Sequence, residues 1–329
     1  MSKIIMGIDG GGTKSHLGLY SVNGDFLGFF KYGTLNHEHM PKGFEELEAT
    51  LHQVINEALG SINKRTSDIA YAVLGLAGVD TREQHEIISS ILKRIGIEKF
   101  TLCNDGYLGV PAGCPNGVGI CAINGTGSVL TAIDTTGKMY QVGGIGDITD
   151  DHGGGYWYGT QLLRNVYNEL FKSGPKTNMT QMLFSTKLFI GHRDLYTEAI
   201  TLAMEANAID YHTLNQLVFT AAGGGDKVAN RILEDSAEHY AKCIEFLANN
   251  LVFPKEETLH ITLAGSIFVR EQVDILPLLI KKRVHQLLGE RPVEFIKLQA
   301  PPVIGAILWA FREIGVSVDI NKIRDGISE

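Results

Sequence analysis

Residues 6–15 read MGIDGGGTKS, in which a short apolar strand enters a glycine-threonine turn and leaves as a second strand. Residues 120–128 repeat this arrangement as ICAINGTGS, again followed by an alternating apolar strand. Tight turns of this kind expose successive backbone N–H groups, which form a nest for anionic oxygen. Two such nests can hold one polyphosphate from opposite sides, so nucleotide phosphate is the first ligand to consider.

Length and composition limit the classes of protein to which the chain can belong. The chain has 329 residues, which is long for one hydrophobic core, so two lobes are expected. A formal net charge of −8 argues against general nucleic-acid binding, which requires concentrated Lys and Arg. The chain contains no apolar stretch of the about 20 residues that span a bilayer, and its first residues lack the features of a signal peptide. We expect a cytoplasmic protein with no membrane and no nucleic-acid partner.

The four cysteines form neither a C-x-x-C pair nor a zinc-binding spacing. They are Cys103, Cys114, Cys121 and Cys243. In a reducing cytosol, this pattern predicts buried free thiols.

Hydrophobic periodicity divides the chain into two halves, and each half is a strand meander followed by alternating helices and strands. The fold class is therefore α/β with a duplicated unit. We predict an N-terminal lobe at residues 1–115 and a C-terminal lobe at 116–315, packed around a cleft. Residues 316–329 are a candidate addition to the first lobe.

The first turn does not match either of two common phosphate-binding motifs. A Walker A loop needs Lys where this chain has Thr13. A Rossmann turn needs a third glycine where this chain has Ser15, and it leads into a helix, whereas the segment here alternates as a strand. A nicotinamide-dependent oxidoreductase is therefore disfavoured.

Asp9 lies beside the first nest, where its carboxylate would repel phosphate unless a cation lay between them. Mg²⁺ bridging carboxylate, water and phosphate would resolve this conflict, so we predict Asp9 as a metal ligand. The alternative is that Asp9 only hydrogen-bonds the turn.

These motifs, with others in the same order, resemble the N-acetylglucosamine kinase family. That family lies within the BadF/BadG/BcrA/BcrD ATPase group of the actin, sugar kinase and Hsp70 superfamily. The resemblance implies a duplicated ribonuclease H-like, two-lobe ATPase fold with an interlobe cleft, and an ATP-dependent amino-sugar kinase. The segments that carry it are IDGGGTKS at 8–15, TLNH at 34–37, NDG at 104–106, NGTGS at 124–128, GG at 143–144 before Asp151, YW at 156–157, GD at 225–226 and AGS at 264–266.

The resemblance implies which residues bind ATP. One side of the phosphates would lie on Gly11, Gly12 and Thr13, the other on Gly125, Thr126 and Gly127, and adenosine on Ala222, Gly225 and Ser266. Lys14 either reaches a phosphate or is solvated. Asp226 after the glycine run could instead simply cap the helix that follows.

Asp105 is the candidate catalytic residue, because it follows a buried strand at the edge where α/β sheets bind ligands. Phosphoryl transfer to an alcohol needs positioning, charge neutralisation and a carboxylate that accepts the hydroxyl proton. We predict that Asp105 fills this role for the sugar primary hydroxyl. The alternative is that Asp105 is only a helix N-cap.

Sugar recognition is implied at Asn36, His37, Gly144, Ile145 and Asp151 by the same resemblance. The chain departs from the family at two points. Ile145 stands where the family commonly has Trp, and Asp-Asp-His-Gly at 150–153 replaces Gly-Asp-Glu-Gly. The acetamido preference is therefore open, and N-acetylmuramate and glucosamine are further candidate substrates.

Two other functions fit the superfamily. One is an ATP-driven activator of a 2-hydroxyacyl-CoA dehydratase, which would need cysteine ligands for an iron–sulfur cluster. The other is a non-enzymatic switch that opens and closes with ATP, which would not need groups that read hydroxyls. A homodimer is expected from the family alone.

Overall fold

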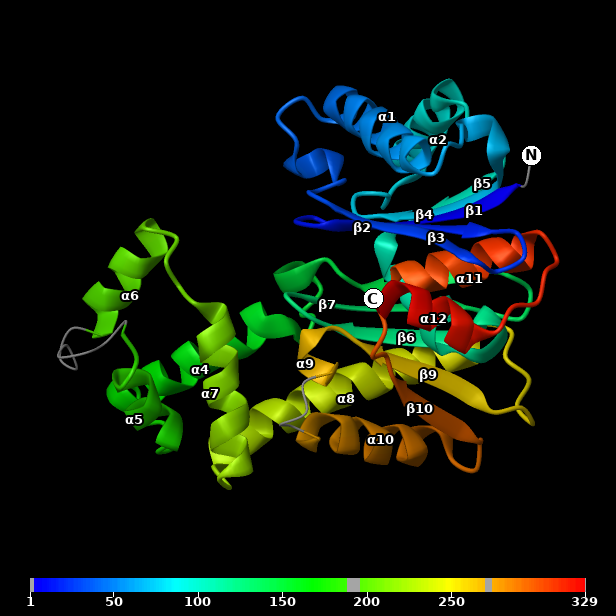
Figure 1. Ribbon diagram of the computed structural model, residues 1–329. Coiled ribbons are helices and arrows are strands. Elements are labelled where there is room, and N and C mark those ends of the chain that lie inside the picture. The colour runs from blue at the N-terminus through cyan, green and yellow to red at the C-terminus, as the bar shows by residue number, and fades with distance from the viewer. Residues whose placement is uncertain (1–2, 188–195, 270–273, 329) are drawn as a thin grey trace.

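The computed structural model describes residues 3–187, 196–269 and 274–328, and two five-stranded sheets of matching topology dominate it (Figure 1). The first has the order β3-β2-β1-β4-β5 and the second β8-β7-β6-β9-β10. In each, an antiparallel meander continues into parallel strands, so the predicted duplicated fold is confirmed. The strands are β1 (Ile4–Gly10), β2 (Ser15–Ser21), β3 (Phe26–Tyr32), β4 (Ile69–Leu76), β5 (Phe100–Cys103), β6 (Gly119–Asn124), β7 (Ser128–Ile133), β8 (Met139–Gly143), β9 (Leu259–Ala264) and β10 (Val293–Lys297).

Helices cover both faces of the sheets. Those of the first half are α1 (Phe44–Ser61), α2 (Arg82–Ile95) and α3 (Gly109–Gly113). Those of the second half are α4 (Gly154–Phe171), α5 (Asn178–Phe184), α6 (Tyr196–Glu205), α7 (Tyr211–Gly223), α8 (Lys227–Asn250), α9 (Ser266–Val269), α10 (Ile275–Leu288), α11 (Val303–Glu313) and α12 (Ile320–Ser328).

The strand pleat explains the layers of the first lobe. Ile4, Met6 and Ile8 share a core with α1 and α2, whereas Ile5 points to the opposite face and packs with α11 and α12. Alternation of this kind follows from the two-residue period of a strand. The layer between the two sheets is therefore formed by α11 and α12 (Figure 1), together with α3.

The end of the chain returns to the first sheet. The Tyr20 hydroxyl on β2 donates to the Ile323 carbonyl of α12 (2.6 Å). Ile307 of α11 lies against Gly7 and Gly18, which have no side chain to hold the helix away. The inner face of the first sheet is thus covered by residues from 303 onward. The lobe boundary near residue 115 stays a prediction.

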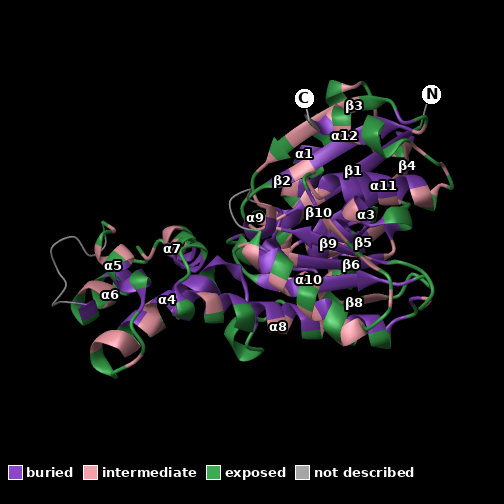
Figure 2. Ribbon diagram, turned by 90° about the horizontal axis from the view of Figure 1, so that it is seen from below, coloured by how far each residue is buried: buried purple, intermediate pink, exposed green. Residues whose placement is uncertain are grey.

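The second sheet carries the larger core. Its outer face packs on α8 and α10, and the long α8 is the helix that follows Asp226. Between β8 and β9 the chain inserts α4 to α7, and α5 and α6 extend away from the sheets (Figure 2). The inner strands of both sheets, such as β1 and β6, are mostly buried in the same view, whereas the edge strands β3, β8 and β10 are intermediate or exposed.

Gly305 tests the close contact between α11 and the turn that carries Asp105. A Cβ at this position would collide with the Leu108 carbonyl oxygen and lie 2.9 Å from the Ala112 nitrogen. We expect Gly305→Ala to lower the free energy of unfolding by about 1–3 kcal/mol, because backbone cannot move aside as a side chain can. Urea unfolding measures this loss. Gly60→Ala in α1, where no atom lies within 4 Å, is the control and should be neutral or slightly stabilising. Equal stability of the two variants would contradict the packing argument.

Candidate active site

The parallel strands of the first sheet end side by side, and acidic residues lie in or just after their last residues. In the register, Asp9 pairs with Gly75 of β4, and Gly75 pairs with Cys103 of β5. Asp105 follows two residues later, as the first residue of the short turn η3 (Asp105–Leu108). Ligands of α/β sheets bind at such carboxyl ends. Asp9 and Asp105 therefore share one edge of the sheet.

Burial sets the chemistry of Asp105. Desolvation, together with the charge of Asp9, raises the pKa of the Asp105 carboxyl to about 7. The Thr131 hydroxyl on β7 donates to the Gly106 carbonyl (2.9 Å), so the turn is held by both lobes. Asn104 is the N-cap of η3, and the alternative that Asp105 is only that cap is therefore wrong. A carboxyl that ionises near neutral pH can exchange a proton with a substrate hydroxyl.

The first glycine turn is bonded to the loop after β3. Within the turn, the Gly11 N–H donates to the Lys14 carbonyl (3.1 Å). The Thr34 hydroxyl donates to the Gly11 carbonyl (3.2 Å), and His39 Nδ1 lies 2.9 Å from the Gly12 carbonyl oxygen. The turn and the loop thus form one unit. Lys14 is exposed, so both interpretations of its side chain stay open.

Asn36 and His37 are buried in this loop. Asn36 Oδ1 accepts a hydrogen bond from the Glu38 N–H (2.9 Å), which fixes the amide. The His37 ring stacks on Phe44, with centroids 4.0 Å apart and 15° between the planes, and burial lowers the pKa of His37. Both side chains lie against Gly78, where a Cβ would come within 2.5 Å of Asn36 Oδ1. The ring therefore supports the loop as a neutral group.

The second glycine turn rests on the N-terminus of α4. The Gly125 N–H donates to the Gly127 carbonyl (3.0 Å) within the turn. From α4, the Gly155 N–H donates to the Gly125 carbonyl (2.8 Å), and the Gly154 N–H donates to Asn124 Oδ1 (2.7 Å). Thr126 and Gly127 are exposed at the tip, where a ligand can approach.

A buried polar network lies behind this turn. Asn124 Nδ2 donates to the Tyr158 hydroxyl (3.2 Å), which lies 2.6 Å from Ser236 Oγ. The Ser236 hydroxyl donates to the His152 carbonyl (2.9 Å). Fully bonded networks of this kind rigidify the groups that they join. This network connects the second turn to the loop that carries Asp151.

Asp151 holds its own loop together. One carboxylate oxygen accepts N–H groups from Gly144 (2.8 Å), Ile145 (3.0 Å) and Gly146 (2.8 Å). The Ile145 side chain, by contrast, is 63% exposed. A cavity of about 500 Å³ opens between this loop and the second turn, and its lining includes Thr126, Gly144, Ile145, Asp151 and Trp157. Gly144, Ile145 and Asp151 thus come together with the predicted phosphate turn.

The predicted adenosine residues belong to two separate turns. Gly265 packs on the backbone of Asn124, which brings Ser266, at the start of α9, next to the second glycine turn. Ala222 and Gly225 lie at the turn between α7 and α8. There Asp226 caps α8 through the Val228 N–H (2.9 Å), and it also accepts the Asn178 N–H (2.6 Å). The capping alternative for Asp226 is confirmed, and adenosine binding at these turns stays a prediction.

Asp9 lies near the end of β1, just before the first turn, and His16 Nδ1 lies 3.7 Å from its Oδ2. Among the described residues there is no group of three or more His, Cys, Asp or Glu that could hold a metal by itself. A single carboxylate is nevertheless sufficient for Mg²⁺ that enters with nucleotide phosphates, because phosphate and water supply its other ligands. The residues present therefore fit a magnesium–nucleotide complex better than a protein-bound metal.

Sequence reasoning assigned no role to two polar residues of the site. Asp80 follows β4 at the same edge and accepts a hydrogen bond from Asn104 Nδ2 (2.8 Å). Its position after an apolar strand was the signal that could have identified it. Trp157 lines the cavity, and its indole N–H is buried without a partner among the described residues. Trp157 belongs to the YW segment that carried the family resemblance, but its residue type alone indicated no role in the site.

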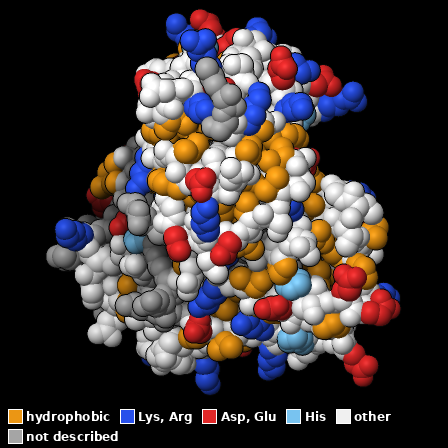
Figure 3. Space-filling model, turned by 45° about the vertical axis from the view of Figure 1, so that its right-hand side comes forward, with side chains coloured by type: hydrophobic (Ala, Val, Ile, Leu, Met, Phe, Trp, Pro, Cys, Tyr) orange, Lys and Arg blue, Asp and Glu red, His pale blue; other side chains and the backbone are white. Residues whose placement is uncertain are grey.

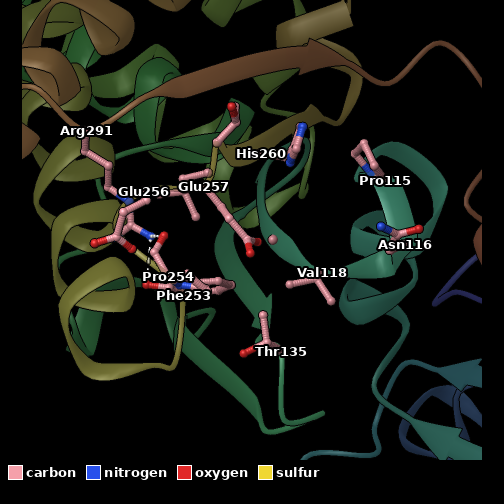
Figure 4. A pocket seen from close by; sticks show the side chains of 13 residues that line it. Pro115, Asn116, Val118, Thr135, Phe253, Pro254, Glu256, Glu257, His260 and Arg291 are labelled. Carbon is pink, nitrogen blue, oxygen red and sulfur yellow. Dashed lines mark hydrogen bonds between the residues drawn. The ribbon is translucent and has the colours of Figure 1, made fainter.

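Other surfaces are remote from this site. A second cavity, of about 630 Å³, is lined by Pro115, Glu257, His260 and Arg291 at the amino ends of β6 and β9 (Figure 4). Acidic and basic side chains are interspersed on the face shown in Figure 3. Within residues 3–187, 196–269 and 274–328, no helix has the length and apolarity of a bilayer span.

The cysteines are free, as predicted, and three of the four are buried. Burial raises the pKa of the Cys114 thiol to about 11 and raises that of Cys103 and Cys121 as well. Cys243 is half-buried, so the expectation of burial is wrong for this thiol. Protonated thiols inside the fold are poor ligands for an iron–sulfur cluster.

Comparison with known proteins agrees with the geometry. Residues 6–310 match the sequence model of the BadF/BadG/BcrA/BcrD ATPase family. The chain belongs to this family. The resemblance found in the sequence is thereby confirmed, and membership supports ATP as the nucleotide.

Relatives of this family member carry kinase names. An N-acetylmuramic acid/N-acetylglucosamine kinase of Clostridium acetobutylicum is 27% identical over 266 residues, which is 80% of this chain and 86% of the relative. An N-acetyl-D-glucosamine kinase of Dictyostelium discoideum is 26% identical over 94% of this chain and 98% of its own. A solved structure from Chromobacterium violaceum, provisionally named an N-acetylglucosamine kinase, has a TM-score of 0.66 at 22% identity and covers 94% of this chain and 99% of its own. At 22% identity, this likeness supports the fold of the chain and says nothing about its function.

Asp151→Ala tests the loop next to the second turn. The substitution leaves three backbone N–H groups without their acceptor, so we expect the loop to loosen and the KM for sugar to rise about tenfold or more. Steady-state kinetics with varied sugar measure this change. Ile148→Ala, in the same loop but with an exposed side chain outside the cavity lining, is the control. A wild-type KM for sugar in Asp151→Ala would contradict the role given to this carboxylate.

Proposed function

We propose that this chain is an ATP-dependent amino-sugar kinase that phosphorylates the 6-hydroxyl of N-acetylglucosamine or a close relative. The observation that carries the proposal is Asp105, a half-buried carboxyl with a pKa of about 7 at the carboxyl edge of the first sheet, in a turn that is also bonded by Thr131 of the second sheet. Kinase names among the relatives support the same reaction.

In the proposed reaction Asp105 accepts the proton of the sugar hydroxyl while that oxygen attacks the γ-phosphorus in line. The turns at Gly11–Thr13 and Gly125–Gly127 would contact the phosphates from two sides through the backbone N–H groups of their later residues, since the Gly11 and Gly125 N–H groups donate inside the turns. Asp9 would hold Mg²⁺, which supplies positive charge to the transferring phosphoryl group. Closure of the lobes would exclude water that otherwise hydrolyses ATP.

Sugar selection would fall to Asn36 and the loop that contains Ile145 and Asp151. The Asn36 amide both donates and accepts, as hydroxyl recognition requires. The exposed Ile145 cannot stack on a sugar as Trp does, and it leaves room for a larger substituent. N-acetylglucosamine, glucosamine and N-acetylmuramate are therefore all substrates to test. A homodimer is proposed from the family resemblance, and light scattering tests it.

A substrate panel tests the proposed activity. We expect ADP release to depend on an amino sugar and on Mg²⁺ when glucosamine, N-acetylglucosamine, N-acetylmannosamine, N-acetylmuramate and glucose are compared. A coupled spectrophotometric assay measures the rates. ATP hydrolysis that is indifferent to every sugar would favour the switch-protein alternative instead.

Asp105→Asn separates catalysis from folding. Because general-base catalysis contributes about 10²–10⁴-fold, turnover should fall by that order while ATP affinity is retained. Wild-type kcat/KM should rise with pH through about 7, as the carboxyl ionises.

The contribution of Asp105 to the free energy of unfolding should fall as pH rises, whereas kcat/KM rises. A raised carboxyl pKa means that the folded state binds the proton more tightly than the unfolded state, so ionisation of Asp105 destabilises the fold as pH rises from 3.8 to about 7. Asp105→Asn removes that cost, and its Tm should exceed the wild-type Tm by more at pH 8 than at pH 5. Near-normal turnover, or a pH-independent Tm difference, would argue against this role.

A further inference from the structure

The residue before the proposed base is held by a carboxylate with no assigned role. Asn104 Oδ1 accepts the Gly106 N–H (2.8 Å), and Asn104 Nδ2 donates to Asp80 Oδ1 (2.8 Å). Both ends of the Asn104 amide are therefore fixed, one by its own turn and one by Asp80. Asp105 lies in the sequence between Asn104 and Gly106, the two residues that this hydrogen bond connects.

Asp80 also begins the segment that starts α2. The Asp80 and Thr81 N–H groups both donate to Gln84 Oε1 (2.9 and 2.8 Å). The Thr81 hydroxyl oxygen in turn accepts the Gln84 N–H, so Thr81 and Gln84 form a capping box at the start of α2. The other end of the Gln84 amide donates to Glu38 Oε1 (3.2 Å). The Glu38 N–H in turn donates to Asn36 Oδ1 (2.9 Å). One hydrogen-bonded chain therefore runs from the turn of the base to the predicted sugar loop.

We propose that Asp80 is a positioning residue for phosphoryl transfer, which holds the Asp105 turn through Asn104 and joins it to the loop that carries Asn36. The proposal rests on the proposed kinase function. A misplacement of reacting groups by about 1 Å can cost about 10²-fold in rate, so a side chain that fixes this turn affects turnover without touching substrate.

The charge of Asp80 acts on the same base. Asp105 faces Asp9 from β1, which has His16 beside it on β2, and Asp80 from the segment after β4. On its own segment the neighbours are Cys103 and Tyr107, whose pKa values are raised and which stay uncharged. A nearby like charge disfavours ionisation of a carboxyl. Asp80 therefore helps to keep the pKa of Asp105 close to neutral, and its removal should lower that pKa.

Two substitutions separate the bond from the charge. Asp80→Asn keeps an oxygen that accepts from Asn104 but removes the charge, and Asp80→Ala removes both. In the pH profile of kcat/KM, we expect the acidic limb of Asp80→Asn to lie about half a pH unit lower than that of the wild type. The shift is modest because solvent screens an exposed charge. Asp80→Ala should show the same shift and an additional loss in kcat of about tenfold. The KM for ATP should stay unchanged in both.

Asp68→Asn is the matched control, because Asp68 accepts the Arg65 N–H (3.0 Å) in a turn at the opposite end of β4. Its pH profile should superimpose on that of the wild type. A purely structural role for Asp80 would lower activity without moving the acidic limb, and that result would overturn the proposal. So would a wild-type kcat in Asp80→Ala.

A second measurement does not need turnover. The carboxyl ¹³C resonance of Asp105, assigned with Asp105→Asn, can be titrated in the wild type and in Asp80→Asn. We expect the midpoint to fall in the variant, and an unchanged midpoint overturns the charge effect. Failure of every sugar in the activity panel would refute the kinase function, whereas this titration would still test the relation between Asp80 and Asp105.

Discussion

Two carboxylates at one edge of a sheet create the constraint on which this site depends. Asp9 lies near the end of β1 and Asp105 follows β5, and the charge of Asp9 raises the pKa of Asp105. Protein stability alone would favour removing such a pair, because a half-buried like charge is costly. The arrangement is useful when a cation and phosphates enter between the turns, since Asp9 then has a partner and Asp105 can act on a proton.

The fold places this pair by duplication. Each half contributes a meander whose first turn is rich in glycine, and the two sheets are separated by α3, α11 and α12. Gly305 lets α11 approach the turn of Asp105, and Thr131 from the second sheet bonds the same turn. The position of the base therefore depends on both lobes, which suits the proposed reaction, in which each substrate would contact both halves of the chain.

Much of this was available from the sequence. The glycine turns, the strand before Asp105 and the two meanders predicted the duplicated fold, because short-range periodicity and turn chemistry specify them. Asp80 was missed because its importance comes from Asn104 and Gln84, partners that only the folded chain brings near. The bonds of Asp151 to three N–H groups were equally invisible, since they depend on positive φ angles at Gly143, Gly144 and Gly146. Patterns of residue types predict elements well, but they do not predict which hydrogen-bond partner a loop side chain takes.

The most direct measurement is a crystal structure with a non-hydrolysable ATP analogue, Mg²⁺ and an amino sugar. The account predicts the triphosphate between Gly11–Thr13 and Gly125–Gly127, the cation at Asp9, and the acceptor hydroxyl within hydrogen-bond distance of Asp105. Phosphates bound away from these turns, for example in the cavity beside Arg291, or an Asp105 carboxylate that faces no substrate oxygen, would contradict it.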